Sequence, residues 1–201
     1  VKHHVYTANP SNKVAPWSSL GDPLYSYESG EHKYITSLSS DGTIMAVGSR
    51  LLDINSVANV GAVFVYQYNG SSWAPLGRMI DYINMNNIIS ENESNFGSST
   101  DGTILAVGAN GFDVDVNGTD RSIGAAFVYQ YNGSSWVPLG GQIDYVNLNG
   151  ISYNENSYFG YSVSLSSDGT ILGTGAFGFY RNNLDNVGAV FAYSLSQTSL
   201  P

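Results

Sequence analysis

The stretch DVDVNG at residues 113–118 carries the residue types that come nearest to a metal site. Aspartate at its first and third positions, asparagine at its fifth and glycine at its sixth are how an oxygen-ligand calcium loop begins. The candidate calcium ligands are Asp113, Asp115, Asn117 and Asp120. Position nine, which needs an acid or a water-holding group, is Arg121, whose positive charge would repel a cation. The segment is therefore either a calcium site or a solvated polar loop.

Four Asn-x-Ser/Thr sequons are a second set of candidate modification sites. The candidate N-glycosylation residues are Asn69, Asn92, Asn117 and Asn132. Asn-Gly pairs are also what tight hairpin turns require, so the same residues can serve only as turn formers. A glycan on Asn117 would occupy one of the proposed calcium ligands. Together with an acidic, cysteine-free and Tyr-rich composition, the sequons favour an extracellular location, secreted or on the cell surface.

Residues for catalysis are few. The histidines are His3, His4 and His32, and the first two would lie on opposite faces of a strand, which makes them a poor ligand pair. A glycosidase pair could in principle come from Asp81, Asp144, Glu91, Glu93 and Glu155. Asp81 and Asp144, however, are equivalent positions of two repeats, and a repeated residue is more often part of the scaffold. We expect no enzymatic activity and, calcium aside, no cofactor.

Composition narrows the class of protein. The chain has 201 residues, of which 42% are hydrophobic, so it can bury a core. A net charge of −9 with only seven basic residues argues against nucleic acid as a partner. The lack of cysteine excludes disulfides and thiolate metal sites, and no apolar run is long enough for membrane insertion. Residues 1–20 lack a signal peptide's apolar core, so we interpret the chain, which starts at Val1, as a mature product or a fragment.

Internal repetition dominates the sequence. One motif occurs three times, as SSDGTIMAVGS (39–49), STDGTILAVGA (99–109) and SSDGTILGTGA (166–176). A second motif follows each copy, as NVGAVFVYQYNGSSWAPLG (59–77), SIGAAFVYQYNGSSWVPLG (122–140) and NVGAVFAYSLSQ (186–197). Such a period indicates stacked or radially arranged units within one repeat domain, 1–201. The approximate units are 1–60, 61–123 and 124–187, with 188–201 starting a further one.

Each unit has the pattern of short strands. In residues 103–109, Leu105 and Val107 alternate with Ile104 and Ala106, so both faces are apolar, as in a strand covered on each side. Asp-Gly and Asn-Gly pairs predict hairpins between the strands. The predicted fold is all-β, made of tandem four-stranded antiparallel blade-like repeats in a partial β-propeller or a stacked blade array.

Trp73 and Trp136 follow YNGSS in two units, and Trp17 is a weaker third copy. We expect the repeated tryptophans to pack between units. The alternative is that they and the 15 tyrosines form stacking platforms for sugars.

The string FGYSVSLSSDGTILGTGAFGF (159–179) followed by NVGAVFAY (186–193) resembles FG-GAP repeats, the blades of integrin-α-like β-propellers. It is most similar to the long-repeat variety found in secreted or surface proteins of microbes and algae. The resemblance implies a propeller fold. The family's calcium loop is replaced by SSDGT or STDGT, turns too short to wrap a calcium ion, so that site is not carried over. Three such motifs are too few for a closed ring, and further blades would lie outside the chain, come from another copy or be absent in a linear stack.

Three departures from the repeat affect the expected architecture. Val5-Tyr6 with PWSSLG (16–21) is a degenerate copy of the second motif, so the chain begins and ends within the same element. This out-of-phase unit could pair with another chain by strand addition. In unit two, FG (96–97) leads directly to Asp101, which predicts a shortened strand and an irregular blade there. DVDVNG lies in a loop that is longer than its counterparts in the other units.

Two functions remain open. The first is an extracellular structural or adhesive protein whose blades pack into a larger propeller, stack or filament through open strand edges. Its partners would be further repeats of the same chain or other copies of it. The second is a lectin-like module that binds glycans through the loops between strands.

Overall fold

The computed structural model describes residues 6–8, 17–24, 34–56, 58–81, 98–100, 102–116, 119–144, 157–181, 184 and 186–195. These residues form strands β1 to β16 and no helix, so the predicted all-β class is confirmed. In the part of the chain described, no helix is long and apolar enough to cross a membrane.

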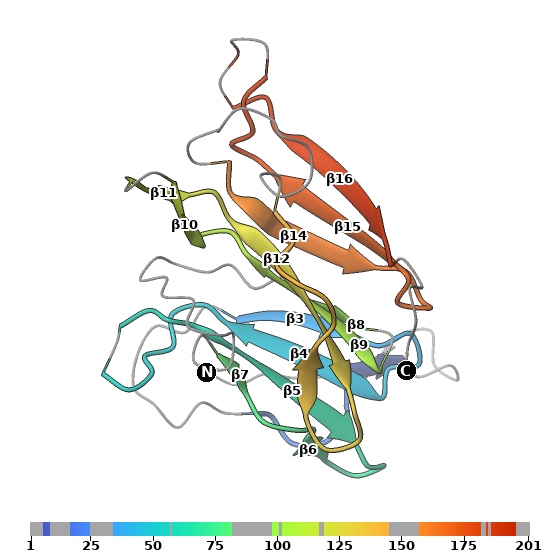
Figure 1. The fold of residues 1–201 in the computed structure, drawn as a ribbon. Coiled ribbons are helices and arrows are strands. Elements are labelled where there is room, and N and C mark those ends of the chain that lie inside the picture. The colour runs from blue at the N-terminus through green and yellow to red at the C-terminus, as the bar shows by residue number, and fades with distance from the viewer. Residues whose placement is uncertain are drawn as a thin grey trace.

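Three antiparallel sheets make up most of the structure (Figure 1). Sheet 1 contains β3 (Tyr34–Leu38), β4 (Ile44–Ser49), β5 (Ala62–Tyr68), β6 (Trp73–Pro75) and the short β7 (Ile80–Asp81), which pairs with β5. Sheet 2 contains β8 (Ser98–Thr100), β9 (Ile104–Ala109), β12 (Ala125–Tyr131) and β13 (Trp136–Pro138). Sheet 3 contains β14 (Phe159–Leu165), β15 (Ile171–Ala176) and β16 (Ala189–Ser194).

Two hairpins lie outside these sheets. They are β1 (Tyr6–Ala8) with β2 (Trp17–Ser19), and β10 (Asp113–Val116) with β11 (Thr119–Ser122). In the first hairpin Ala8 is opposite Trp17, just as Tyr68 is opposite Trp73 in sheet 1. The β1–β2 hairpin is therefore the backbone counterpart of β5–β6, which confirms the degenerate copy expected near the N-terminus.

The same strand register recurs in all three sheets. Ile44, Ile104 and Ile171 open equivalent strands, and they lie opposite Gln67, Gln130 and Ser194. Within the described residues β8 covers three residues, against five for β3 and seven for β14, and the shortened strand of unit two stays a prediction. Sheet 2 nevertheless keeps four strands in the order β13-β12-β9-β8.

The Asp-Gly turns hold the central hairpins. The Asp41 carboxylate accepts hydrogen bonds from the Ser39 hydroxyl at 2.6 Å and from the Thr43 backbone N–H at 2.9 Å. Asp168 accepts equivalent bonds from Ser166 and Thr170. These bonds, led by the serine hydroxyl, lower the pKa of Asp41, and they lower that of Asp168 to about 2. The turns are thus made by local side-chain chemistry.

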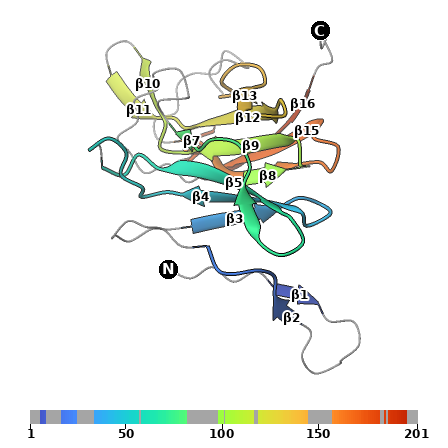
Figure 2. The same ribbon diagram turned by 90° about the horizontal axis from the view of Figure 1, so that it is seen from below.

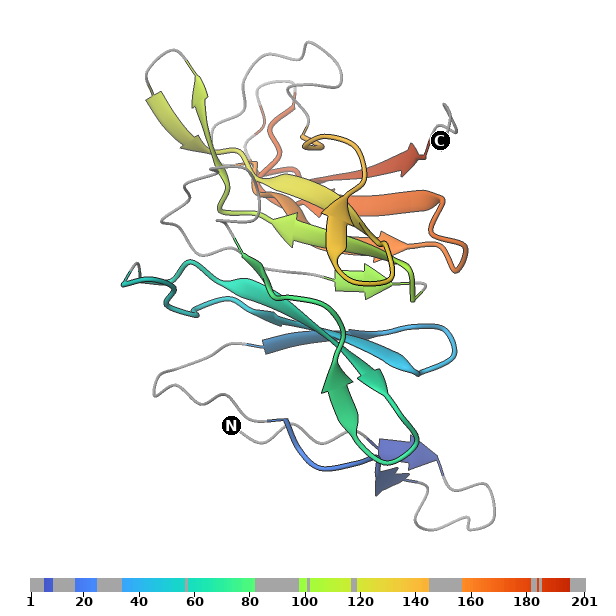
Figure 3. The same cartoon turned by 60° about the horizontal axis from the view of Figure 1, so that its bottom comes forward.

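The sheets are stacked face to face in chain order, with β1–β2 beyond sheet 1 (Figures 2 and 3). We call the face of each sheet directed toward β1–β2 its leading face, and the opposite face its trailing face. Leu105 and Val107 of sheet 2 belong to the core shared with sheet 1, whereas Ala106 and Ala126 belong to the core shared with sheet 3. The prediction of strands covered on both faces is confirmed for sheet 2.

Candidate interaction surface

The tryptophan that begins β6 and the one that begins β13 each form a hydrogen bond with the preceding repeat unit. The indole N–H of Trp73 donates to the Leu20 carbonyl at 3.0 Å, and that of Trp136 donates to the Leu76 carbonyl at 2.9 Å. Both tryptophans are buried. The prediction that they pack between units is confirmed, and their burial makes these two rings unavailable as stacking platforms for sugars.

The glycine of the Leu-Gly pair leaves the space that the tryptophan ring occupies. Gly77 has a φ of +78°, and a Cβ added there would lie 3.0 Å from Cδ1 of Trp136. A side chain at this position would be strained and would also press on the indole. Glycine after leucine is therefore part of the tryptophan-binding site.

The Phe-Gly motif joins sheets 2 and 3 by direct backbone contact. Phe159 is fully buried, and its backbone N–H donates to the Ile123 carbonyl at 2.9 Å. A Cβ on Gly160 would lie 2.1 Å from the Ala125 oxygen, and one on Gly108 would lie 2.0 Å from the Gly160 oxygen. The sheets approach this closely because glycine lacks a Cβ.

Two buried carboxylates lie at equivalent places in successive sheets. Asp81 and Asp144 are both buried, and Asp144 accepts a hydrogen bond of 2.6 Å from the side-chain amide of Gln142. Burial first, and then the Asp81 charge, raises the pKa of Tyr129 in the next sheet. Burial and the Asp144 charge raise the pKa of Tyr193 to about 12 in the same way.

The structure thus places Asp81 and Asp144 in different inter-sheet seams and does not bring them together as a catalytic pair. The other predicted acids, Glu91, Glu93 and Glu155, and the histidines His3, His4 and His32, lie outside the described residues.

The predicted calcium segment forms the β10–β11 hairpin. Asp113 is opposite Ser122, and Asp115 is opposite Asp120, so the backbone of both segments is extended strand. Asn117 and the side chains of the three aspartates lie outside the described part of the structure. Calcium binding there stays a prediction. Among the described residues, no three His, Cys, Asp or Glu side chains are grouped as a metal site.

Two of the four sequons lie at exposed hairpin tips. Asn69 Oδ1 accepts the backbone N–H groups of Ser71 and Ser72 at 3.0 and 2.9 Å, and Asn132 makes the same turn. Both asparagines are exposed, so they form tight turns that are accessible to modifying enzymes. Asn92 and Asn117 lie outside the described residues.

The trailing face of sheet 3 is uncovered, which sequence reasoning missed. Val190 is 85% exposed, whereas Val63, at the same position of sheet 1, is 0% exposed. Ile171 is 44% exposed, against 5% for its counterpart Ile44. No sequence signal could have revealed this, because the residue types are those of the covered faces.

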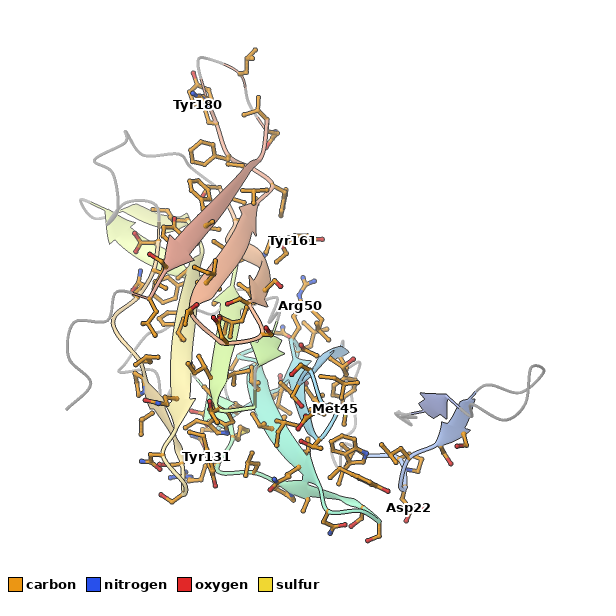
Figure 4. The ribbon with its side chains drawn as sticks, turned by 90° about the vertical axis from the view of Figure 1, so that its right-hand side faces the viewer. Asp22, Met45, Arg50, Tyr131, Tyr161 and Tyr180 are labelled. Carbon is orange, nitrogen blue, oxygen red and sulfur yellow. The ribbon has the colours of Figure 1, made fainter. Side chains whose placement is uncertain are left out.

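An aromatic cluster at the edge of sheet 3 is the second exposed feature. Phe177 stacks on Tyr158 with ring centroids 4.6 Å apart, and Tyr161 contacts Phe177 edge-on at 4.8 Å. Phe177 and Tyr161 are each 49% exposed. The signal was present in the sequence, since Phe177 replaces the Asn110 and Arg50 of the other units. Tyr161 is labelled beside sheet 3 in Figure 4.

Fold and surface together define an all-β protein of stacked, repeated antiparallel sheets, with exposed apolar side chains on the trailing face of sheet 3. No protein-family model matches the chain, and no curated protein is similar to it in sequence.

Proposed function

We propose that the protein is an extracellular structural or adhesive repeat protein, and that its stack of sheets continues beyond sheet 3 through self-association. The observation that carries the proposal is the exposure of Val190 and Ile171 at positions that are buried in sheet 1. Contiguous apolar surface of this kind usually marks an interaction site. The interfaces between sheets 1 and 2 and between sheets 2 and 3 are the model for this contact. In each of them the leading face of the next sheet covers the positions equivalent to Val190 and Ile171.

The family and the location are part of the proposal. The stacked antiparallel sheets support membership of the FG-GAP repeats, and the buried Phe159-Gly160 gives that motif a physical role. Exposed sequon asparagines at Asn69 and Asn132, an acidic composition and the absence of cysteine support an extracellular location. Expression in a eukaryotic secretory system, followed by glycosidase treatment and mass spectrometry, tests it. Unmodified Asn69 and Asn132 would contradict the glycoprotein assignment.

Light scattering coupled to size exclusion, with electron microscopy, tests the assembly. We expect the wild-type chain to form concentration-dependent oligomers and Val190→Asp to shift them to monomers, because a charge on the covered face would be buried without a partner. The matched control is Ser40→Asp, which adds the same charge at the exposed tip of the β3–β4 turn, away from both faces of sheet 1, and should leave assembly unchanged. A compact wild-type monomer at all concentrations would refute the proposal.

A lectin-like role is the second candidate, and the cluster of Tyr158, Tyr161 and Phe177 favours it. Exposed aromatic rings stack on the apolar faces of sugars, and this cluster is not repeated in the other units, as a specific site would require. A glycan array probed with wild type and Phe177→Ala tests this role. Silence across diverse polysaccharides, or binding that the variant retains in full, would exclude this cluster as the site.

A further inference from the structure

The β1–β2 hairpin and sheet 3 each contain part of the repeated sheet, and within the described residues their strands are complementary. Sheet 3 has the counterparts of β3, β4 and β5, but within the described residues it has no counterpart of β6. The β1–β2 hairpin has the counterparts of β5 and β6 and, within the same limits, none of β3 or β4. β1 and β16 are therefore equivalent strands, and β2 is the type of strand that has no counterpart in the described part of sheet 3.

The Leu-Gly pair that would receive the tryptophan of such a strand is already in place after β13 of sheet 2. Leu139 and Gly140 are the counterparts of Leu76 and Gly77, and Gly140 has a φ of +84°, where an added Cβ would meet no atom within 4 Å. The Leu139 backbone N–H donates to the Val128 carbonyl at 2.8 Å, but no described residue donates to its own carbonyl. In sheets 1 and 2 the equivalent carbonyls, those of Leu20 and Leu76, each accept a tryptophan N–H.

The donor is present in the same chain. Trp17 holds the register position of Trp73 and Trp136, and it is followed by Leu20-Gly21 as each of those is followed by Leu-Gly. In the described structure β2 pairs with β1, and the edge of β16 that faces away from β15 offers six residues. Figure 3 shows β2 and β16 at opposite ends of the stack of sheets. β2 of one copy can therefore reach β16 only in another copy.

We propose that β2 of a second copy adds to the free edge of β16, with its Trp17 on the Leu139 carbonyl. This inference rests on the proposed self-association and specifies its contact. Sheet 1 of the second copy then covers Ile171 and Val190, because its leading face already packs Met45 and Val47 against the Leu20 and Leu24 that follow β2. The interface is head-to-tail, and it generates a ring if the rotation closes and a filament if it does not.

Disulfide trapping tests the register. Thr7 is opposite Ser18 in the hairpin, as Gln67 is opposite Ala74 in sheet 1, so Ser194 should lie opposite Ser18 of the second copy. Paired residues of adjacent strands have Cα atoms about 5.5 Å apart, which a disulfide can span. Because the chain has no cysteine, Ser18→Cys with Ser194→Cys introduces the only thiols.

On oxidation we expect covalent oligomers joined through positions 18 and 194, at least about tenfold more than for Ser18→Cys with Ala192→Cys, which is two residues out of register. Non-reducing electrophoresis and peptide mapping are the measurements. Equal yields from the two pairs, or a disulfide within one chain, would overturn the proposal.

A peptide separates this inference from the proposed function. A fluorescent peptide of residues 17–24, WSSLGDPL, should bind the full chain, and its Trp17→Ala version should bind at least about tenfold more weakly. If the wild type assembles and Val190→Asp prevents it, but the peptide and the cysteine pair give no signal, strand addition is wrong and self-association stands. If the chain is monomeric, self-association is wrong, and the peptide alone decides whether β16 accepts this strand.

Discussion

The backbone crossing at Gly160 yields the sharpest test of how the sheets are held together. In Gly160→Ala the new Cβ would lie 2.1 Å from the Ala125 oxygen, whereas an ordinary contact begins at 3.4 Å, so sheets 2 and 3 must separate by about 1.3 Å. A gap of 0.5–1 Å already removes about a quarter to a half of the contact energy of facing atoms. The consequence must therefore appear at the seam between the two sheets.

The expected loss follows from the side chains in that seam. Its four large buried residues are Ile123, Phe159, Leu172 and Phe179. Burial of each stabilises the fold by about 1.5–3 kcal/mol, so losing a quarter to a half of it costs about 2–6 kcal/mol in total. The positive φ of Gly160 adds about 1–2 kcal/mol for an L-residue. We expect Gly160→Ala to lower the free energy of unfolding by at least about 3 kcal/mol.

Two matched glycines separate the causes. Gly140→Ala has a similar φ, +84°, but its Cβ meets no atom within 4 Å, so it should cost only about 1 kcal/mol. Gly108→Ala has no positive φ but would place its Cβ 2.0 Å from the Gly160 oxygen, so it should cost about 3 kcal/mol. Urea unfolding followed by circular dichroism gives the free energies, and hydrogen exchange of β14–β16 locates the loss. Equal stability of all three variants, within about 1 kcal/mol, would refute the close approach of the two sheets.

Further predictions concern the repeated contacts. Trp136→Phe removes the N–H bonded to the Leu76 carbonyl and should cost about 1–3 kcal/mol in urea unfolding; no measurable cost would contradict that bond. The folded-state pKa of Asp168, about 2, is below its ordinary 3.8, so its stabilising contribution is complete above about pH 4 and is lost as pH falls through 2. In Asp168→Asn the melting temperature should depend less on pH between pH 4 and 2 than in the wild type. An unchanged pH dependence would contradict the lowered pKa of Asp168. The folded-state pKa of Tyr193, about 12, exceeds its ordinary 10.0, so stability should fall as pH rises from 10 through 12. Tyr193→Phe should reduce that fall, and absorbance titration of the phenols at high pH checks the assignment.

Much of the fold was predictable because its signals are local. The Asp-Gly turns at Asp41 and Asp168 are made by side chains two residues away, and those residues are visible in the sequence. The interlocking of Trp73 and Trp136 with neighbouring units was predicted from their repetition, although their acceptors, Leu20 and Leu76, were not.

The candidate surface was much less predictable than the strands. DVDVNG was interpreted as a calcium loop or a polar loop, and its backbone is a hairpin whose two strands flank Asn-Gly, a known turn signal. Val190 and Val63 occupy equivalent positions in nearly identical motifs, yet one is exposed and the other is buried. Nothing in the local pattern distinguishes them, because burial depends on the sheet that lies opposite.

The sequence by itself determined where strands and turns occur and which residues are equivalent among the units. Alternating side chains and Asn-Gly or Asp-Gly turns act over a few residues, so a single unit suffices to specify them. The tertiary structure alone decided which of two apolar faces is covered and which Leu-Gly pair receives a tryptophan. Those outcomes depend on contacts between residues distant in the chain, such as the 60 positions between Leu76 and Trp136, and the last sheet has no described partner to make them.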